Sequence, residues 1–314
     1  MITVAKCNNN ISVQDLGRAA AQHCGFSASG AADEYSFLLA NQLLGNAANT
    51  PAFEVFMGNV TLNVSQPCDI AITGAPCEIL INHQLAPSRQ RFSLNAGDTL
   101  QLKTPKNMLY SYISIKGGIN CKKWLESASF TSHESHIDGH IQPIVAGDRF
   151  AFSESSTIKN TKGKPLNKER SLFFHQPGEQ TLTLRFIPSN FFNAWTPHHQ
   201  STFLDQRYCI ATNSNKMGYR LTGKAITVET DEQRLSKPVS LGTIQLPPDG
   251  QPIVLMKARQ TIGGYPVLGT VIQTDVYRLS QKRPSEHVCF KTTSLAQAQA
   301  QLLAYKHRMG LSSP

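Results

Sequence analysis

The densest group of side chains able to carry chemistry lies in one stretch of the chain, residues 242–266. Two consecutive prolines preset φ and Asp249-Gly250 tolerates a left-handed turn, so the apolar runs 243–246 and 252–256 are expected to fold back as a hairpin or sharp corner. Polar side chains would then crowd around that corner, from Gln245, Asp249, Gln251, Arg259, Gln260 and Thr261. The stretch is therefore the first candidate for a binding or catalytic site.

Arg259 has the most direct chemical use in this stretch. It follows the second apolar run and precedes Gly263 and Gly264, where the missing side chains let the backbone approach a ligand, and Tyr265 and Pro266 form the exit. A guanidinium there can hold a carboxylate or a phosphoryl oxygen through two parallel hydrogen bonds. The structural alternative is an ion pair with Asp249 that braces the corner.

Two further candidate groups lie near the beginning of the chain. Asp15 and Arg18 stand three residues apart in a polar loop, where a structural ion pair is the alternative. Ser29 or Asp33 can cap a helix expected over about residues 31–45, because their oxygens accept from the open N–H groups of its first turn. The same N–H groups can instead hold an anion.

Amides, a guanidinium and imidazoles supply the remaining candidates. Asn213, Asn215 and Arg220 offer directional donors to a carboxylate or phosphate, and a turn asparagine with a surface arginine is the structural alternative. Three histidines in a polar loop have a spacing that can bind a metal, but no regular framework or carboxylate cluster accompanies His133, His136 and His140. We predict no metal site.

The elements that must position these residues are mostly strands. Apolar residues alternate from residue 52 onward, and Gly and Pro interrupt them about every ten residues. Residues 2–5 and 11–13 are expected to pair as a short hairpin, 181–188 to form a strand and 295–308 a closing helix. Turns at 95–98, 145–148 and 283–286 are expected to begin returning barrel strands.

Composition sets limits on the function. The 314 residues carry a net charge of +9, but the cations are scattered, so we expect no nucleic-acid partner. The seven cysteines are odd in number and lack a C-x-x-C spacing, which favours reduced thiols over disulfides or zinc. Without a signal-like start or an apolar run of membrane length, we expect a cytoplasmic protein and no membrane partner.

Several segments together resemble one protein family, formerly called allophanate hydrolase subunit two. Residues 245–266 are similar to its signature IQVPPDGQPIVL…RQTTGGYP, residues 13–18 to its opening IQDLGR, and residues 213–221 to its block QSNRMGYRL. Residues 25–33 and 112–119 resemble its loop GVPxSGAMD and its strand YLAVAGGI. The family includes the C subunit of bacterial ATP-dependent 5-oxoprolinase, the antagonist of a histidine-kinase inhibitor, and part of the carboxyltransferase domain of urea carboxylase.

The resemblance implies a mainly β fold with a few helices, in two lobes of twisted antiparallel sheet or β-barrel, the second cyclophilin-like. We place an N-terminal lobe at 1–158, a linker at 159–170 and a C-terminal barrel lobe at 171–314, with residues 24–309 forming one carboxyltransferase-type unit. The implied activity is that of 5-oxoprolinase, with homologues of its B and A subunits as partners in a hetero-oligomer. ATP with Mg²⁺, shared with the partner, is the implied cofactor.

Two departures from the family pattern leave alternatives open. Ala128 stands where the family has an arginine, and Ala258 where it commonly has an aspartate. The loss of two charged groups is compatible with a regulatory protein that binds and antagonises a kinase inhibitor similar to the 5-oxoprolinase B subunit. A third hypothesis is the carboxyltransferase component of a biotin-dependent enzyme that acts on amides. The only Met-Lys pair lies in an apolar run, so we expect no covalently attached biotin.

Overall fold

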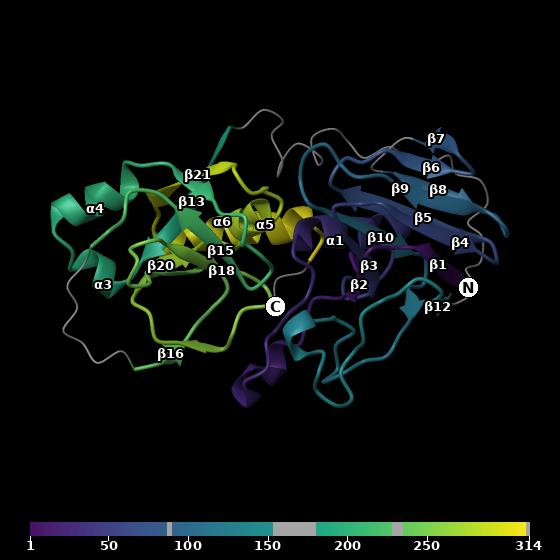
Figure 1. Cartoon of the computed structure of the whole chain (residues 1–314), viewed down its shortest axis with the longest axis horizontal. Coiled ribbons are helices and arrows are strands. Elements are labelled where there is room, and N and C mark those ends of the chain that lie inside the picture. Colours follow the sequence, from purple (N-terminus) through teal and green to yellow (C-terminus); the bar gives the residue numbers. More distant parts are fainter. Residues whose placement is uncertain (87–89, 153–179, 228–234, 312–314) are drawn as a thin grey trace. The chain divides into compact units, whose positions relative to one another are not determined.

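The computed structural model describes residues 1–86, 90–152, 180–227 and 235–311, and the chain is mainly β, as expected. It divides into two compact units (Figure 1). The first contains Met1–Arg18 and the described residues from Ser29 to 152, and the second contains Ala19–Ala28 and the described residues from 180 onward. Each unit has its own apolar core. The linker expected at 159–170 lies outside the described residues.

The first unit consists of two sheets. The seven-stranded sheet has the order β11 (Ile119–Asn120), β12 (Arg149–Phe152), β1 (Ile2–Lys6), β4 (Val60–Val64), β9 (Thr99–Leu102), β6 (Ile79–Ile81) and β7 (Gln84–Ala86). The five-stranded sheet has the order β2 (Ile11–Gln14), β3 (Ala52–Phe56), β10 (Tyr110–Ile115), β5 (Cys68–Gly74) and β8 (Arg91–Leu94). Neighbouring strands in both sheets run antiparallel.

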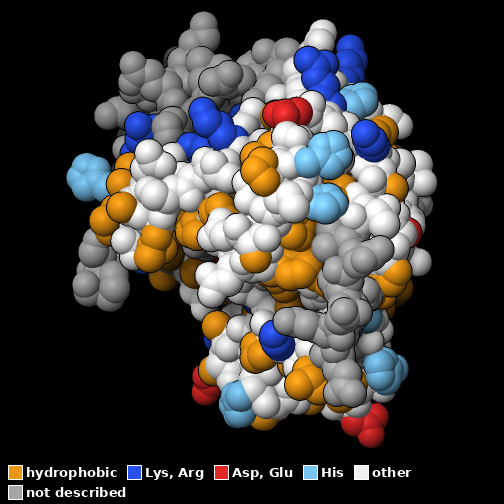
Figure 2. Space-filling view, turned by 90° about the vertical axis from the view of Figure 1, so that its left-hand side faces the viewer, with side chains coloured by type: hydrophobic (Ala, Val, Ile, Leu, Met, Phe, Trp, Pro, Cys, Tyr) orange, Lys and Arg blue, Asp and Glu red, His pale blue; other side chains and the backbone are white. Residues whose placement is uncertain are grey.

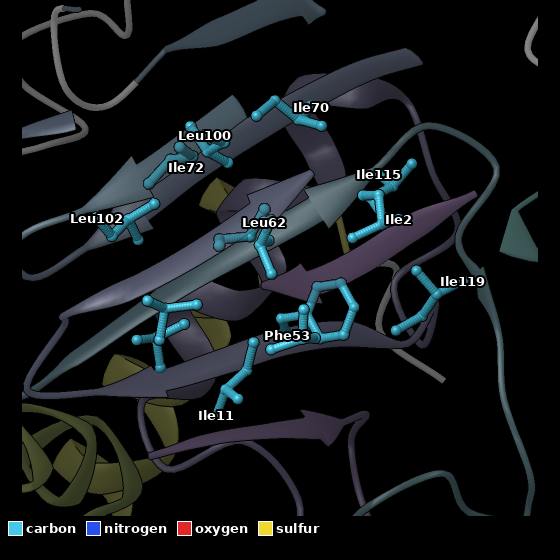
Figure 3. Packing of buried hydrophobic residues seen from close by; sticks show 14 of the residues in the cluster. Ile2, Ile11, Phe53, Leu62, Ile70, Ile72, Leu100, Leu102, Ile115 and Ile119 are labelled. Atoms are coloured by element: carbon cyan, nitrogen blue, oxygen red, sulfur yellow. The ribbon is translucent and has the colours of Figure 1, made fainter. Parts of the chain in front are cut away.

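Apolar side chains from both sheets fill the core of the first unit (Figure 3). Leu62 and Leu100 come from the larger sheet, and Phe53, Ile70 and Ile115 come from the smaller one, all at most 1% exposed. Because side chains alternate between the two faces of a strand, every second residue of each strand can reach this core. Each such side chain contributes about 1.5–3 kcal/mol of burial free energy.

The expected N-terminal hairpin does not form. Residues 2–6 and 11–14 are strands, but β1 pairs with β4 and β12, whereas β2 pairs with β3 in the other sheet. The turn between them, with Asn9 at φ 55°, carries the chain from one sheet to the other. Both strands bury apolar side chains in the shared core. Burial of this apolar surface against the opposite sheet stabilises the two strands in different sheets more than pairing with each other would.

Helix α1 (Glu34–Leu44) packs against β5 and β10 of the smaller sheet. The Asp33 side chain accepts a hydrogen bond from the Ser36 N–H and so caps the helix, while Gly45 ends it in the left-handed conformation at φ 64°. Both ends agree with the expected helix. Since the Asp33 carboxylate occupies the open N-terminus, the anion-binding alternative is not needed there.

The second unit is a closed barrel of seven strands, which confirms the expected barrel. Its order is β13 (Thr181–Pro188), β20 (Val267–Val271), β17 (Thr243–Gln245), β18 (Ile253–Leu255), β15 (Gly218–Thr222), β14 (Tyr208–Ile210) and β21 (His287–Thr292). Strands β13 and β21 run parallel, and the other neighbours run antiparallel. In its core, the ring centroids of Phe186, Phe203 and Phe290 are 4.5–5.9 Å apart.

Short helices and a small ribbon complete the second unit. They are η1 (Ala19–Cys24), α3 (Asn190–Asn193), α4 (Pro197–Leu204), α5 (Gln273–Ser280), α6 (Leu295–Arg308) and the two-stranded sheet of β16 (Lys237–Pro238) and β19 (Ile262–Gly263). Helix α6 has the predicted bounds and begins with a capping box between Ser294 and Gln297.

Figure 2, which looks onto the α3 and α4 end, shows Lys and Arg side chains gathered along its upper part and few acidic ones. No helix in the described ranges is long and apolar enough to span a membrane.

Three predicted turns share one geometry. In each, a carboxylate accepts the backbone N–H of the residue three positions earlier: Asp98 from Asn95, Asp148 from Val145 and Glu286 from Arg283. The residue before the carboxylate has a positive φ, namely Gly97, Gly147 and Ser285. The third turn begins barrel strand β21, but the first two begin β9 and β12 of the open seven-stranded sheet, so the prediction of barrel strands was wrong for those two.

Candidate functional site

The predicted corner at residues 242–266 is a β-hairpin on the barrel. Strands β17 and β18 pair antiparallel with Ile244 opposite Val254, and the turn closes through a Gly250 N–H to Pro247 O hydrogen bond of 3.0 Å. Gly250 has φ +71°, and a Cβ there would lie 2.6 Å from the Ile226 nitrogen. The turn therefore requires glycine both for its backbone conformation and for a close approach.

The polar residues of the corner separate into two groups. Asp249 and Gln251 lie at the turn end of β18, whereas Arg259 lies beyond its other end. The Asp249 Oδ1 accepts from the Gln251 N–H at 3.0 Å. The Gln251 amide bonds to both the N–H and the carbonyl of Gly223, at 2.8 and 3.1 Å. These two side chains stabilise loops, and the suggested ion pair between Asp249 and Arg259 is absent from the described part of the chain.

Arg259 is a buried cation. It is 6% exposed, and its Nε donates to the Val239 carbonyl at 3.4 Å. Within the described ranges, no carboxylate pairs with its guanidinium, and burial lowers its pKa to about 10. It therefore remains charged near neutral pH, with no carboxylate counter-ion among the residues that the structure describes. An unpaired buried charge is costly, and an anionic ligand would offset that cost.

Gln245 lies on the outer side of β17 at the same place. Its neighbours Ile244 and Leu246 belong to the barrel core, so strand alternation directs Gln245 away from the core, toward the β16–β19 ribbon. It is 1% exposed, and its Nε2 has no hydrogen-bond partner in the described structure. A Cβ on Gly263 would lie 2.4 Å from that Nε2, so Gly263 packs closely against the Gln245 amide, which would have to shift if residue 263 carried a side chain.

Val239 links the two polar side chains. Its carbonyl accepts from Arg259, and its N–H donates to the Thr261 carbonyl at 3.0 Å. Its Cγ1 would lie 3.5 Å from a Cβ on Gly263, the residue that packs against Gln245. The structure thus brings together Gln245, Arg259, Thr261 and Gly263. Val239 was not predicted from the sequence, because a valine that contributes only its backbone gives no recognisable signal.

The remaining predicted residues of this unit lie at its surface or in turns. Gln260 is exposed, Tyr265 is 44% exposed, and Gly264 lies between Gly263 and Tyr265 at the end of the ribbon. Asn213 and Asn215 are exposed, and the Asn215 Oδ1 accepts from the Met217 N–H at 2.8 Å, as a turn asparagine does. The exposed Arg220 lies on β15 between two core residues and so points outward.

The block 213–221 nevertheless borders the site. The carbonyls of Lys216 and Met217 accept from the N–H groups of Ala258 and Met256, at 2.8 and 2.9 Å, immediately before Arg259. Ala258 is 5% exposed, so the position where the family commonly has an aspartate is covered in this protein. Lys257 is 8% exposed and has its ammonium 5.7 Å from the centre of the Tyr277 ring.

In the first unit, Asp15 is saturated by protein donors. Its Oδ1 accepts from Ser127 Oγ and Ser129 Oγ, each at 2.6 Å, and from the Gly17 N–H at 2.8 Å, and its Oδ2 accepts from the Ala128 N–H at 2.7 Å. The side chain is 1% exposed. Asp15 therefore holds the loop that contains residues 127–129 in place. These hydrogen bonds account for the buried Asp15 carboxylate without a ligand.

Arg18 belongs to a buried cluster on the next part of that loop. Its Nη1 lies 3.3 Å from Glu134 Oε2, its Nη2 donates to the Ser129 carbonyl, and its guanidinium lies 4.9 Å from the centre of the Trp124 ring. Desolvation by burial lowers its pKa, and the neighbouring Glu134 and Asp15 carboxylates partly oppose this shift. The structural alternative paired Arg18 with Asp15, whereas the salt bridge that the structure shows for Arg18 is with Glu134.

His140 is the third member of that cluster. Its Nδ1 lies 2.7 Å from the Ile141 carbonyl, which places the proton on Nδ1 and leaves Nε2 as a lone-pair nitrogen 3.9 Å from Glu134 Oε2. His133 also approaches Glu134, at 3.6 Å. Across the described ranges, no three His, Cys, Asp or Glu side chains are grouped for a metal.

We expect His140 to make stability depend on pH. Burial lowers its pKa below the ordinary 6.5, so in acid the unfolded chain binds this proton more readily than the folded chain does. Its stabilising effect is complete above pH 6.5 and is lost as pH falls through the folded pKa. Thermal unfolding between pH 7.5 and 5 should show a smaller decline in His140→Gln than in wild type. His136→Gln, an exposed control in the same loop, should decline like wild type; equal declines in all three would contradict the assignment.

Ser29, Asp33 and Ala128 complete the predicted positions. Ser29, 1% exposed and at φ 52°, donates to the Phe130 carbonyl at 3.3 Å, and Asp33 caps α1 as described. Ala128 is fully buried in the first core, so the position of the family's arginine carries no charge here.

The two cores, the closed barrel and the buried cation define a mainly β protein with a candidate anion site on its second unit. The chain belongs to the family described as carboxyltransferase domain, subdomain A and B, whose model matches residues 24–292. It is 30% identical to the C subunit of 5-oxoprolinase from Haemophilus influenzae, over 95% of this chain and 93% of that protein. It is 31% identical to the C subunit of 5-oxoprolinase from Escherichia coli, with the same coverage.

A solved structure shows the same fold in a much larger protein. The crystal structure of the K. lactis urea amidolyase matches 100% of this chain and 20% of that chain, with a TM-score of 0.88 and 20% identity. At that identity the likeness concerns the fold alone. The family resemblance inferred from the motifs is confirmed.

Proposed function

We propose that this chain is the C subunit of an ATP-dependent 5-oxoprolinase, which converts 5-oxoproline, ATP and water to glutamate, ADP and phosphate together with its B and A subunits. The names of the two bacterial relatives support a multi-subunit complex. The observation that carries the proposal is the Arg259 guanidinium, buried and without a carboxylate partner in the described ranges. Such a group suits the anions in this reaction, a substrate carboxylate and the phosphoryl group.

The proposed phosphoryl transfer to the lactam depends on positive charge at the site. Resonance stabilises the lactam against water, and transfer of a phosphoryl group to its oxygen creates a leaving group that lowers the barrier to ring opening. Positive charge and fixed donors then stabilise the transferring phosphoryl oxygens. We assign ATP and its Mg²⁺ to a site shared with the B subunit, and Arg259 to the carboxylate of 5-oxoproline.

The test is reconstitution. The chain is combined with homologues of the B and A subunits from its own source, and ADP formation is measured with and without 5-oxoproline. We expect turnover that depends on 5-oxoproline and disappears when this chain is omitted. A stable complex without such turnover would refute the proposal and favour the regulatory alternative, for which the buried, uncharged Ala128 is the supporting observation.

A further inference from the structure

Among the described residues, two buried donors on the outside of the barrel lack the partners that buried polar groups normally have. The Gln245 Nε2 has none, and the Arg259 guanidinium has one hydrogen bond, from Nε to Val239, within the described ranges. An unsatisfied buried amide or guanidinium destabilises the folded state, and a structural role would favour an apolar residue in its place. Both lie near Val239, and this shared neighbour points to a ligand that completes both.

We infer that Gln245 and Arg259 form one recognition site for a small cyclic amide that carries a carboxylate, with the Gln245 carboxamide on the ring amide and the Arg259 guanidinium on the carboxylate. The inference rests on the proposed function and assigns its substrate selection to this chain. Val239 relates the two side chains: its carbonyl accepts from Arg259, and its Cγ1 lies near the Gly263 position that packs against Gln245.

The donor and acceptor pattern of a lactam matches a primary carboxamide. A five-membered ring holds its amide in the cis form, so the lactam N–H and C=O point to the same side. A glutamine carboxamide likewise presents one N–H and its C=O on one side, and the two groups can form a pair of antiparallel hydrogen bonds. A glutamate in its place could accept from the lactam N–H but could not donate to the lactam oxygen.

The charge pattern fits a carboxylate on the same ligand. Arg259 provides a planar fork that binds a carboxylate with two parallel hydrogen bonds, and no protein carboxylate competes for it in the described ranges. Burial strengthens this contact because the local dielectric is low. A ligand with only one of the two groups would satisfy only one of the two side chains.

Entry to Gln245 requires movement of the β16–β19 ribbon, which covers its Nε2. The ribbon pairs through two residue pairs, Lys237 with Gly263 and Pro238 with Ile262, and through the Val239 to Thr261 hydrogen bond. Ile262 is 55% exposed, so its side chain contributes little buried apolar surface to the ribbon.

The test compares ligands and variants by calorimetric titration of the chain assembled with the B and A subunits, without ATP. The ligands are 5-oxoproline, 2-pyrrolidone, which lacks the carboxylate, proline, which lacks the ring amide, and inorganic phosphate. Wild type should bind 5-oxoproline at least about tenfold more tightly than each of the others. Arg259→Lys should lose the preference over 2-pyrrolidone, and Gln245→Glu the preference over proline. The exposed controls Arg207→Lys and Gln299→Glu should keep both preferences.

A second variant covers the case in which a buried glutamate prevents folding. Gln245→Met removes the amide but keeps the length of the side chain, and it should raise the unfolding midpoint by about 2–4 °C while losing the preference over proline. Failure of wild type to bind 5-oxoproline, unchanged preferences in the variants, or phosphate binding as tight as 5-oxoproline would overturn the inference. Intact selectivity without ATP turnover would refute the proposed function and leave this site standing.

Discussion

Arg259→Lys is expected to fold and assemble normally but to lose most 5-oxoproline-dependent ATP turnover. Lysine keeps the charge and loses the planar fork, so the transition state should lose about 2–4 kcal/mol of stabilisation if the contact resembles other oxyanion donors. That loss corresponds to a rate about thirtyfold to a thousandfold lower. The measurement is kcat and KM of the reconstituted enzyme, together with thermal unfolding of the variant chain.

Arg207→Lys makes the same change at an exposed arginine before β14 and should leave turnover unchanged. A structural role for Arg259 gives a different result. In that case the variant would unfold at a lower temperature while turnover per folded molecule stayed at the wild-type value. One version of that role, a brace between Asp249 and Arg259, does not form among the described residues, where burial is the cause of the lowered Arg259 pKa.

Asp15→Asn is expected to have the largest effect on stability. The carboxylate accepts four hydrogen bonds at 2.6–2.8 Å from donors alone, and an asparagine would turn an N–H₂ group toward some of them. We expect the free energy of unfolding to fall by about 2–4 kcal/mol, since each such bond to a charged group contributes and the buried donors would be left unsatisfied. Urea unfolding followed by circular dichroism measures the change.

Asp138→Asn is the matched control for this experiment, because Asp138 is an exposed aspartate in the same part of the first unit. It should leave the free energy of unfolding within about 0.5 kcal/mol of wild type. If Asp15→Asn kept wild-type stability and instead weakened 5-oxoproline binding, Asp15 would return to the binding site suggested by its position in the motif.

Local chemistry determined many elements from the sequence. The Pro-Pro-Asp-Gly turn predicts the β17–β18 hairpin, an Asp cap and a Gly end predict α1, and the cations of the last turn followed by Gly310 predict α6. The three turns with a carboxylate at their last position follow from the same short-range rules. Arg259 could also be chosen as the chief candidate from its place between an apolar strand and a Gly-Gly loop.

Only the tertiary structure decided which distant residues meet. Asp15 accepts from Ser127 and Ser129, 112 and 114 residues away, protein partners that its position in the motif did not indicate. Residues 2–6 and 11–14 went to different sheets, although a turn joins them. Arg259 donates to Val239, which lies in none of the motifs, and Gln245 packs against Gly263. Turn chemistry and periodicity act over a few residues, whereas partners far apart in sequence are selected by burial of whole faces, which no short segment encodes.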